Sequence, residues 1–185
     1  WYEKGAALMG LGRRGEALEA FTRALELDPS RREAWKHRGS LLFEEKSLEA
    51  ALEAFDQVIR IDPKDAGAWY NRGCILGDLG DTDGAVGSFD RALAIDPGNS
   101  RAWNNKGAIL FQLENSAGAV DAFDHSLEID PENAGTWFNR GLAEMELGQD
   151  EAAVESFART LDLDPGNAEA WFQKGKGLER SGRPA

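Results

Sequence analysis

Residues 66–99 read AGAWYNRGCILGDLGDTDGAVGSFDRALAIDPGN, and variants of this stretch return every 34 residues along a chain of 185 residues. The stretch carries one tryptophan near its start and one proline near its end. All six tryptophans of the chain keep this spacing, as do five of the six prolines. The chain is therefore an array of repeated units, and its function must be sought on a surface that the array creates. The tryptophans are Trp1, Trp35, Trp69, Trp103, Trp137 and Trp171.

Each unit is predicted to be a pair of helices. In residues 66–99, Trp69, Gly73 and Leu76 have helical spacing, and a second helical pattern includes Ala85 and Phe89. The small residues Gly73 and Ala85 let the two backbones approach closely while the aromatic rings fill the space beside them. One such hairpin cannot bury its apolar faces alone, so we expect neighbouring units to stack.

Turn and capping residues set the predicted boundaries, and no strands are expected. We predict helices over residues 1–11, 14–28, 33–45, 48–61, 66–79, 82–95, 100–113, 116–129, 134–147, 150–163 and 168–180. The predicted N-caps are Ser47, Asp81 and Asn115 for second helices, and Asp65, Asn99, Asn133 and Asn167 for first helices. The turns inside the hairpins are marked by Gly12, Gly80 and Gly148.

The repeated pattern resembles the tetratricopeptide repeat family. The second unit shows it as Trp35, Gly39, Leu42, Ala51, Phe55 and Pro63. The resemblance implies an all-α, right-handed superhelical solenoid of antiparallel helix pairs that binds proteins and is not an enzyme. Two departures stand out. Glu144 occupies a position that is apolar in the other units, and a cation precedes each repeated glycine where the family usually has leucine. The cations are Lys4, Arg38, Arg72, Lys106, Arg140 and Lys174.

We expect residues 1–185 to form one array, with units at 1–31, 32–65, 66–99, 100–133 and 134–167 and a partial unit at 168–185. The array is expected to be an excerpt from a longer chain, because it opens within a unit and closes where a second helix would begin. In the other interpretation the last helix is a solvating cap.

Composition restricts the classes of partner. The formal net charge is −12, and nucleic-acid-binding proteins usually present basic faces instead. No apolar run reaches the roughly 18 residues of a membrane span. Cys74 is the only cysteine, which fits a reducing, cytoplasmic location. We therefore expect no nucleic-acid partner and no membrane partner.

Catalytic chemistry has little support in the sequence. His37 and His125 lie in different units without the ligand spacing of a zinc site. Cys74 has no sequence neighbour that would activate its thiol. We expect no catalytic residue, no metal and no cofactor.

The family resemblance places a peptide-binding groove along the first helices of successive units. A strip of aromatic rings beside a ladder of asparagines suits an extended peptide, because amides bond a backbone and rings accept side chains. The alternative is that these positions are only a half-exposed surface. The predicted groove residues are Tyr2, Lys36, Phe43, Tyr70, Asn71, Arg101, Asn104, Asn105, Phe111, Phe138 and Asn139.

Some family members clamp the terminal carboxylate of a partner. In this chain Lys36, Asn71 and Arg101 match that clamp in kind, whereas Ser40 and Asn105 do not. The loss of a cation and an amide donor weakens a site that depends on charge-assisted hydrogen bonds.

The cations before the glycines have two interpretations. They could form a stripe that binds anions, or their stems could cover the core between units while their charges reach solvent. We expect the second, with five of the cations paired to the aspartates ten residues before them, namely Asp28, Asp62, Asp96, Asp130 and Asp164.

Protein or peptide binding is the predicted function. One alternative is a rigid spacer or a module that stacks on itself head to tail through its terminal helices. Another is a regulatory array joined to a catalytic domain outside this sequence.

Overall fold

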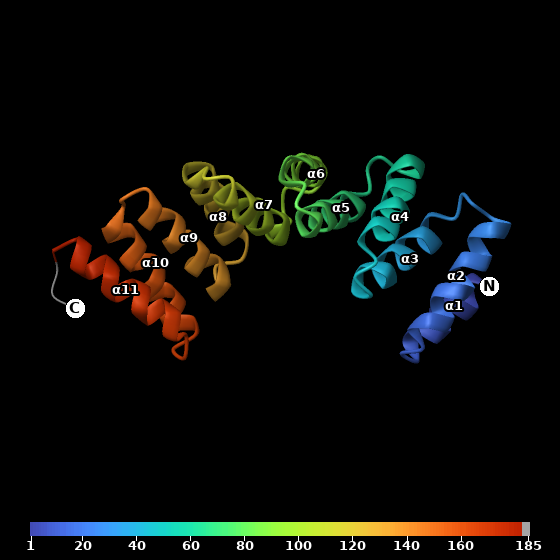
Figure 1. Ribbon diagram of the computed structural model, residues 1–185, viewed down its shortest axis with the longest axis horizontal. Coiled ribbons are helices and arrows are strands. Elements are labelled where there is room, and N and C mark those ends of the chain that lie inside the picture. Colours follow the sequence, from blue (N-terminus) through green and yellow to red (C-terminus); the bar gives the residue numbers. More distant parts are fainter. Residues whose placement is uncertain (183–185) are drawn as a thin grey trace. The chain divides into compact units, whose positions relative to one another are not determined.

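A computed structural model describes residues 1–182, which fold into eleven α-helices and contain no strand. The first ten helices, labelled in Figure 1, form five pairs joined by short turns, and α11 follows as a single first helix within the described residues. Their bounds are α1 Tyr2–Gly10, α2 Arg14–Leu27, α3 Arg32–Glu44, α4 Leu48–Ile61, α5 Ala66–Leu79, α6 Thr82–Ile95, α7 Ser100–Gln112, α8 Ser116–Ile129, α9 Ala134–Glu146, α10 Asp150–Leu163 and α11 Ala168–Arg180.

All eleven predicted helices are confirmed, and each end lies within one residue of its predicted place. The agreement has a local cause at most N-termini. The side chains of Asp65, Asn99, Asn133 and Asn167 each accept a hydrogen bond from the backbone N–H three residues later. Asp81 and Asn115 do the same for second helices. The predicted cap at Ser47 is wrong, because its hydroxyl makes no capping hydrogen bond.

The turns inside the hairpins use one left-handed residue each. Gly12, Gly80 and Gly148 have φ between 72° and 83°, a conformation that glycine adopts without steric cost. At the equivalent place in the second and fourth units stand Lys46 and Glu114, with φ of 60° and 59°. These two turns therefore hold a side chain in a strained backbone region.

The chain divides into two compact units, Trp1–Asp96 and Pro97–Ala185. Each has its own core, in which a fully buried phenylalanine of a second helix lies against a glycine of the first helix. A Cβ built on any of these glycines would come within 2.6–2.9 Å of the ring. The pairs are Gly5–Phe21, Gly39–Phe55 and Gly73–Phe89 in the first compact unit, and Gly107–Phe123 and Gly141–Phe157 in the second. The assignment of residues 1–185 to one array of six units stays a prediction.

Glu144 is part of the core of the second compact unit, although it is ionisable. Its side chain is 1% exposed. One carboxylate oxygen lies 2.8 Å from Nη1 of Arg140, and the other accepts a hydrogen bond from Oγ of Ser156 at 2.6 Å. Burial raises the pKa of Glu144, against the opposing effects of Ser156 and Arg140. The departure from an apolar residue is thus accommodated by a buried polar network.

The predicted ion pairs of Arg72 and Arg140 with the aspartates ten residues earlier are wrong. Nε of Arg72 lies 2.8 Å from Asp56, and Nε of Arg140 lies 2.6 Å from Asp124, in each case an aspartate sixteen residues earlier on the preceding second helix. Asp62 instead accepts a hydrogen bond from the backbone N–H of Lys64 and pairs with Arg32. Its carboxylate is therefore occupied within the turn between hairpins.

The cation before each glycine also lies over a tryptophan ring. The charged group stands 4.9–5.8 Å from the centroid of the tryptophan three residues earlier, a cation–π distance. This contact holds the stem of the cation against the helix surface. It accounts for the recurrence of the cation as a packing feature. The pairs are Trp1–Lys4, Trp35–Arg38, Trp69–Arg72, Trp103–Lys106, Trp137–Arg140 and Trp171–Lys174.

Candidate functional site

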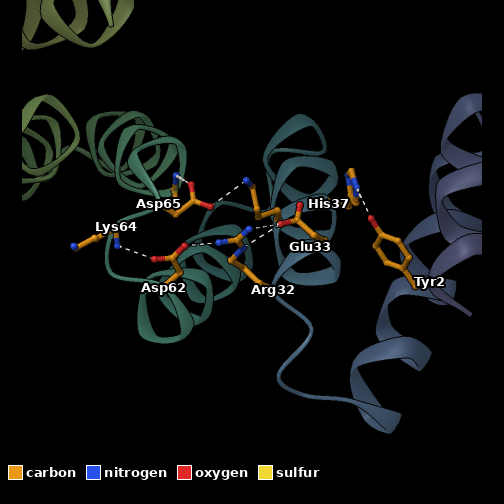
Figure 2. Close-up of polar contacts among 9 residues, drawn as sticks. Tyr2, Arg32, Glu33, His37, Asp62, Lys64 and Asp65 are labelled. Carbon is orange, nitrogen blue, oxygen red and sulfur yellow. Dashed lines mark hydrogen bonds and ion pairs between the residues drawn. The ribbon is translucent and has the colours of Figure 1, made fainter. Parts of the chain in front are cut away.

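First helices of neighbouring hairpins contact each other within each compact unit. In the first, the hydroxyl of Tyr2 on α1 lies 3.4 Å from Nε2 of His37 on α3 (Figure 2). In the second, Thr136 on α9 donates a hydrogen bond to Oδ1 of Asn104 on α7 at 3.1 Å. We call the surface formed by the first helices of each compact unit its first-helix face. In the first compact unit it lies over α1, α3 and α5, and in the second over α7 and α9.

The predicted groove residues are distributed over both compact units. Ten of the eleven are half-buried, and Arg101 is exposed. The structure therefore gives them enough support to be ordered and enough exposure to touch a partner. The first compact unit holds Tyr2, Lys36, Phe43, Tyr70 and Asn71, and the second holds Arg101, Asn104, Asn105, Phe111, Phe138 and Asn139.

Three of the aromatic rings on the first-helix face are supported from below by the core. The rings of Tyr2, Tyr70 and Phe138 lie 5.9, 6.1 and 5.7 Å from Phe21, Phe89 and Phe157, all in tilted geometry. Phe43 and Phe111 pack against the edges of core clusters in their own compact units. The underlying rings fix each aromatic side chain, so a partner would meet a rigid apolar surface.

The asparagines do not form a uniform ladder. Asn104 is engaged twice, since its Oδ1 accepts from Thr136 and its Nδ2 lies 3.5 Å from Oδ1 of Asn105. The side-chain amides of Asn71 and Asn139, in contrast, make no hydrogen bond within residues 1–182. Each of these amides keeps both a donor and an acceptor for solvent or a ligand.

Lys36 is already neutralised within the first compact unit. Its Nζ lies 3.0 Å from Asp65, whose side chain is 8% exposed and also accepts a hydrogen bond from the backbone N–H of Ala68 (Figure 2). Burial alone would raise the pKa of Asp65, but the Ala68 N–H and the Lys36 ammonium outweigh it and hold that pKa below its ordinary value. The partial carboxylate clamp stays a prediction, and its Lys36 would have to leave Asp65 to serve in it.

Two residues on the first-helix face had not been predicted as site residues. The ring of His37 stacks on Phe21 at 5.2 Å between centroids, and the guanidinium of Arg31 lies 4.3 Å above the ring of Tyr2. Arg31 occupies an N-cap position where the third to sixth units have Asp or Asn, and it makes no side-chain capping hydrogen bond. This break in the capping pattern was the sequence signal for a different role at that position.

The part of the chain that the structure describes holds neither a metal-ligand cluster nor a membrane-spanning helix. No group of three or more His, Cys, Asp or Glu side chains could hold a metal ion there. The ring of His125 lies against Trp103, with 4.5 Å between centroids. Among residues 1–182, no helix has the length and apolar character needed to cross a bilayer.

Comparison with protein families settles what kind of array this is. A family model described as tetratricopeptide repeat matches residues 2–66 and 70–134, and a second model with the same description matches residues 134–167. The chain belongs to the tetratricopeptide repeat family. The matched segments cover most of the chain, so the expected all-α tetratricopeptide fold is confirmed.

Solved tetratricopeptide structures share this fold. The crystal structure of MamA is 21% identical, with a TM-score of 0.84 over 89% of this chain and 96% of that chain. YrrB, described as a TPR protein with an unusual peptide-binding site, is 23% identical, with a TM-score of 0.82 over 92% of this chain and 88% of that chain.

The first TPR of Spaghetti, bound to the HSP90 peptide SRMEEVD, is 23% identical, with a TM-score of 0.62 over 65% of this chain and 96% of that chain. At these identities the similarity concerns the fold alone. No curated protein matches the sequence of this tetratricopeptide chain.

Proposed function

We propose that this tetratricopeptide array is a non-enzymatic interaction scaffold that binds an extended peptide or protein segment on its first-helix face. The observation that carries the proposal is one side-chain pair that recurs in both compact units. Tyr70 and Phe138 are rings supported by a buried phenylalanine, and the next residues, Asn71 and Asn139, have amides with no partner within residues 1–182.

This pair has the chemistry that an extended peptide requires. An asparagine amide donates to a backbone carbonyl and accepts from a backbone N–H, independently of the ligand's sequence. The adjoining ring offers apolar area to a ligand side chain at low entropic cost, because the core already holds it in place. Two proteins of this fold support such a use: YrrB has an unusual peptide-binding site, and the first TPR of Spaghetti is bound to a peptide of HSP90.

The remaining parts of the proposal rest on composition. A net charge of −12 opposes binding to nucleic acid, and the single cysteine suits a cytoplasmic location. Self-stacking is a second candidate, favoured by two exposed tryptophans: Trp1, just before α1, and Trp171, in α11, are each 56% exposed. The same net charge opposes association between copies. The rigid spacer and the regulatory array joined to a catalytic domain are further alternatives.

The test is selection from a displayed library of unstructured peptides. The intact chain and an Asn71→Glu, Asn139→Glu variant are panned in parallel, and affinities of enriched peptides are measured by fluorescence anisotropy. We expect the variant to lose at least about tenfold in affinity, because two amides become acceptor-only anions.

The matched control is Glu53→Gln, Glu155→Gln, which changes two exposed charges on second helices. It should keep the selected peptides with unchanged affinity. Peptides that the groove variant still binds equally well, or a library that yields none, would refute binding on the first-helix face.

A further inference from the structure

Two equivalent residue pairs on the first-helix face of the first compact unit differ in how they hold a cation. Tyr2 and Lys36 are 34 residues apart, and so are Arg31 and Asp65. In one pair the ammonium of Lys36 lies 3.0 Å from the carboxylate of Asp65, which neutralises its charge. In the other pair the guanidinium of Arg31 lies 4.3 Å from the centroid of the Tyr2 ring, which carries no charge. The charge of Arg31 is therefore not neutralised by its partner.

Arg31 is exposed and forms no ion pair with any carboxylate of residues 1–182. The adjacent Arg32, in contrast, pairs with Asp62. The charge of Arg31 acts on Asp28, but the carboxylate of Asp28 accepts hydrogen bonds from the hydroxyl and the backbone N–H of Ser30, at 2.6 and 3.1 Å. These bonds, and then the charge of Arg31, lower the pKa of Asp28. The guanidinium of Arg31 thus keeps its hydrogen-bond donors for an acceptor outside the chain.

The Tyr2 ring is a fixed support for Arg31. Its hydroxyl lies 3.4 Å from Nε2 of His37 on α3 (Figure 2). Its centroid lies 5.9 Å from that of the buried ring of Phe21 on α2. A guanidinium over an aromatic ring keeps its N–H donors, because they lie in its own plane and point away from its edges. Arg31 can therefore stay on Tyr2 and still donate two parallel hydrogen bonds to a carboxylate.

We propose that Arg31, positioned by Tyr2, binds an acidic side chain, aspartate or glutamate, of the segment that occupies the first-helix face. This inference rests on the proposed function and adds a sequence preference to it. Exposed charges farther apart than about 8 Å are largely screened at physiological salt, so the local cation outweighs the net charge of −12 at this point. The same net charge disfavours acidic residues along the rest of the segment. The preference should therefore fall on one position of the ligand.

Lys36 is a poorer partner for that acidic side chain, although it is the lysine of the partial carboxylate clamp. Its ammonium would have to leave Asp65, whose side chain is 8% exposed. Asp65 would then keep only the hydrogen bond from the backbone N–H of Ala68 at 2.9 Å, and a buried carboxylate without its cation is costly. Arg31 has no such ion pair to break. The ligand carboxylate is therefore directed to Arg31 and not to Lys36.

The test uses the peptides that the intact chain selects from the displayed library. The peptides are displayed through their C-termini and are then synthesised with an amidated C-terminus, so that side chains supply their only carboxylates. Each acidic residue is exchanged singly for its amide, Asp for Asn or Glu for Gln. Affinities are measured by fluorescence anisotropy at about 0.15 M salt. We expect one exchange to weaken binding by about threefold to tenfold.

The partner of that side chain is identified with Arg31→Gln in the chain. Arg31 makes no side-chain capping hydrogen bond, so this change should leave α3 intact, which circular dichroism would check. The variant should bind the acidic peptide about threefold to tenfold more weakly than the intact chain does. Exchange of the acidic residue should then have no further effect, as a double-mutant cycle would show.

The matched control is Arg38→Gln, which removes the same charge from the same first helix. Arg38 also lies over an aromatic ring, that of Trp35 at 5.4 Å, and forms no ion pair within residues 1–182. This variant should keep both the affinity for the acidic peptide and the full effect of the exchange. An equal loss in the Arg38→Gln chain would show a general effect of net charge and would overturn the proposal.

Three further outcomes would overturn the proposal and leave the proposed function standing. The selected peptides could share no acidic residue, exchange of that residue could leave the affinity unchanged, or its effect could persist in the Arg31→Gln chain. An effect that persists there but disappears in Lys36→Gln would assign the carboxylate to the clamp lysine. A library that yields no peptide, or peptides that the Asn71→Glu, Asn139→Glu variant binds equally well, would refute the proposed function and this inference together.

Discussion

The indole Nε1–H of Trp69 donates a hydrogen bond to the carbonyl oxygen of Pro63 at 3.0 Å. The same bond, at 2.9–3.1 Å, joins Trp35, Trp103, Trp137 and Trp171 to the proline six residues earlier. A tryptophan at the start of a hairpin thus ties down the turn that enters it. This bond gives the tryptophan a fixed place relative to the turn, because the indole nitrogen reaches a backbone carbonyl that no helix satisfies.

Loss of that indole bond should destabilise the array. Trp69→Phe keeps an aromatic ring under Arg72 but removes the donor, so we expect about 1–2 kcal/mol less unfolding free energy in urea titrations followed by circular dichroism. Trp103→Phe removes the equivalent bond to Pro97 and should lose a similar amount of stability. Unchanged stability in both variants would contradict a structural role for the bond.

The repeated glycines should respond in opposite ways to one added methyl group. Gly73→Ala places a Cβ about 2.7 Å from the ring of Phe89, so we expect a loss of about 1–3 kcal/mol through overpacking. Gly175→Ala meets open space, so the higher helix propensity of alanine should stabilise α11 by about 0.5–1 kcal/mol. Thermal and urea unfolding of the two variants would check the signs. A loss at Gly175 equal to that at Gly73 would contradict the open space beside Gly175.

Replacement of the buried carboxylate should stabilise the second compact unit. Glu144→Leu restores the residue type of the other units, and Arg140 keeps its pair with Asp124. Exchange of a buried ion pair for a packed apolar side chain is often favourable by about 1–4 kcal/mol at neutral pH. Hydrogen exchange at amides of α9 and α10 would localise the gain. Glu146→Leu, at an exposed site of the same helix, should change stability by less than about 0.5 kcal/mol.

The effect of Glu144 on stability should depend on pH. Because its pKa in the folded chain is raised, the folded state binds more protons than the unfolded state once pH exceeds the ordinary glutamate value of about 4.3. Wild-type stability relative to Glu144→Leu should therefore be highest below that pH and fall as pH rises through the folded pKa. Urea titrations from about pH 4 to 8 would measure the difference. A difference that is constant with pH would show that the pKa of Glu144 is the same in both states.

The strained turn at Glu114 offers a simple stabilising change. Its φ is 59°, whereas Gly80 and Gly148 occupy the equivalent position in the neighbouring odd-numbered units. Glu114→Gly should relieve strain of about 1–3 kcal/mol but lose some through unfolded-state entropy, leaving a gain of about 0.5–1 kcal/mol. Differential scanning calorimetry would detect it as a higher Tm. Glu114→Ala retains the strain and should not raise Tm.

The sequence was sufficient for the helices because their determinants are local. Period, capping side chains and turn glycines all act within a few residues, so every helix end was predicted to within one residue. The cap at Ser47 failed even so, and nothing in the structure explains why this hydroxyl makes no capping hydrogen bond.

The candidate site was less predictable because its contacts join different hairpins. Asn71 and Asn104 are aligned in neighbouring groove positions, yet Asn104 is bonded to Thr136 while Asn71 has no partner within residues 1–182. The ion pairs of Arg72 and Arg140 likewise span sixteen residues between helices, which no local pattern encodes. Such contacts depend on the packing of one hairpin on the next.

The residues in the left-handed turns alternate with a period longer than one hairpin. Glycine occupies the turn at 12, 80 and 148, whereas Lys46 and Glu114 occupy it in between. Arg23, Arg91 and Arg159 alternate in the same way with Gln57 and His125. At these two positions the period is therefore two hairpins, although the tryptophans repeat with every hairpin. Excising two adjacent hairpins together would preserve the alternation of the turns, whereas excising one would break it.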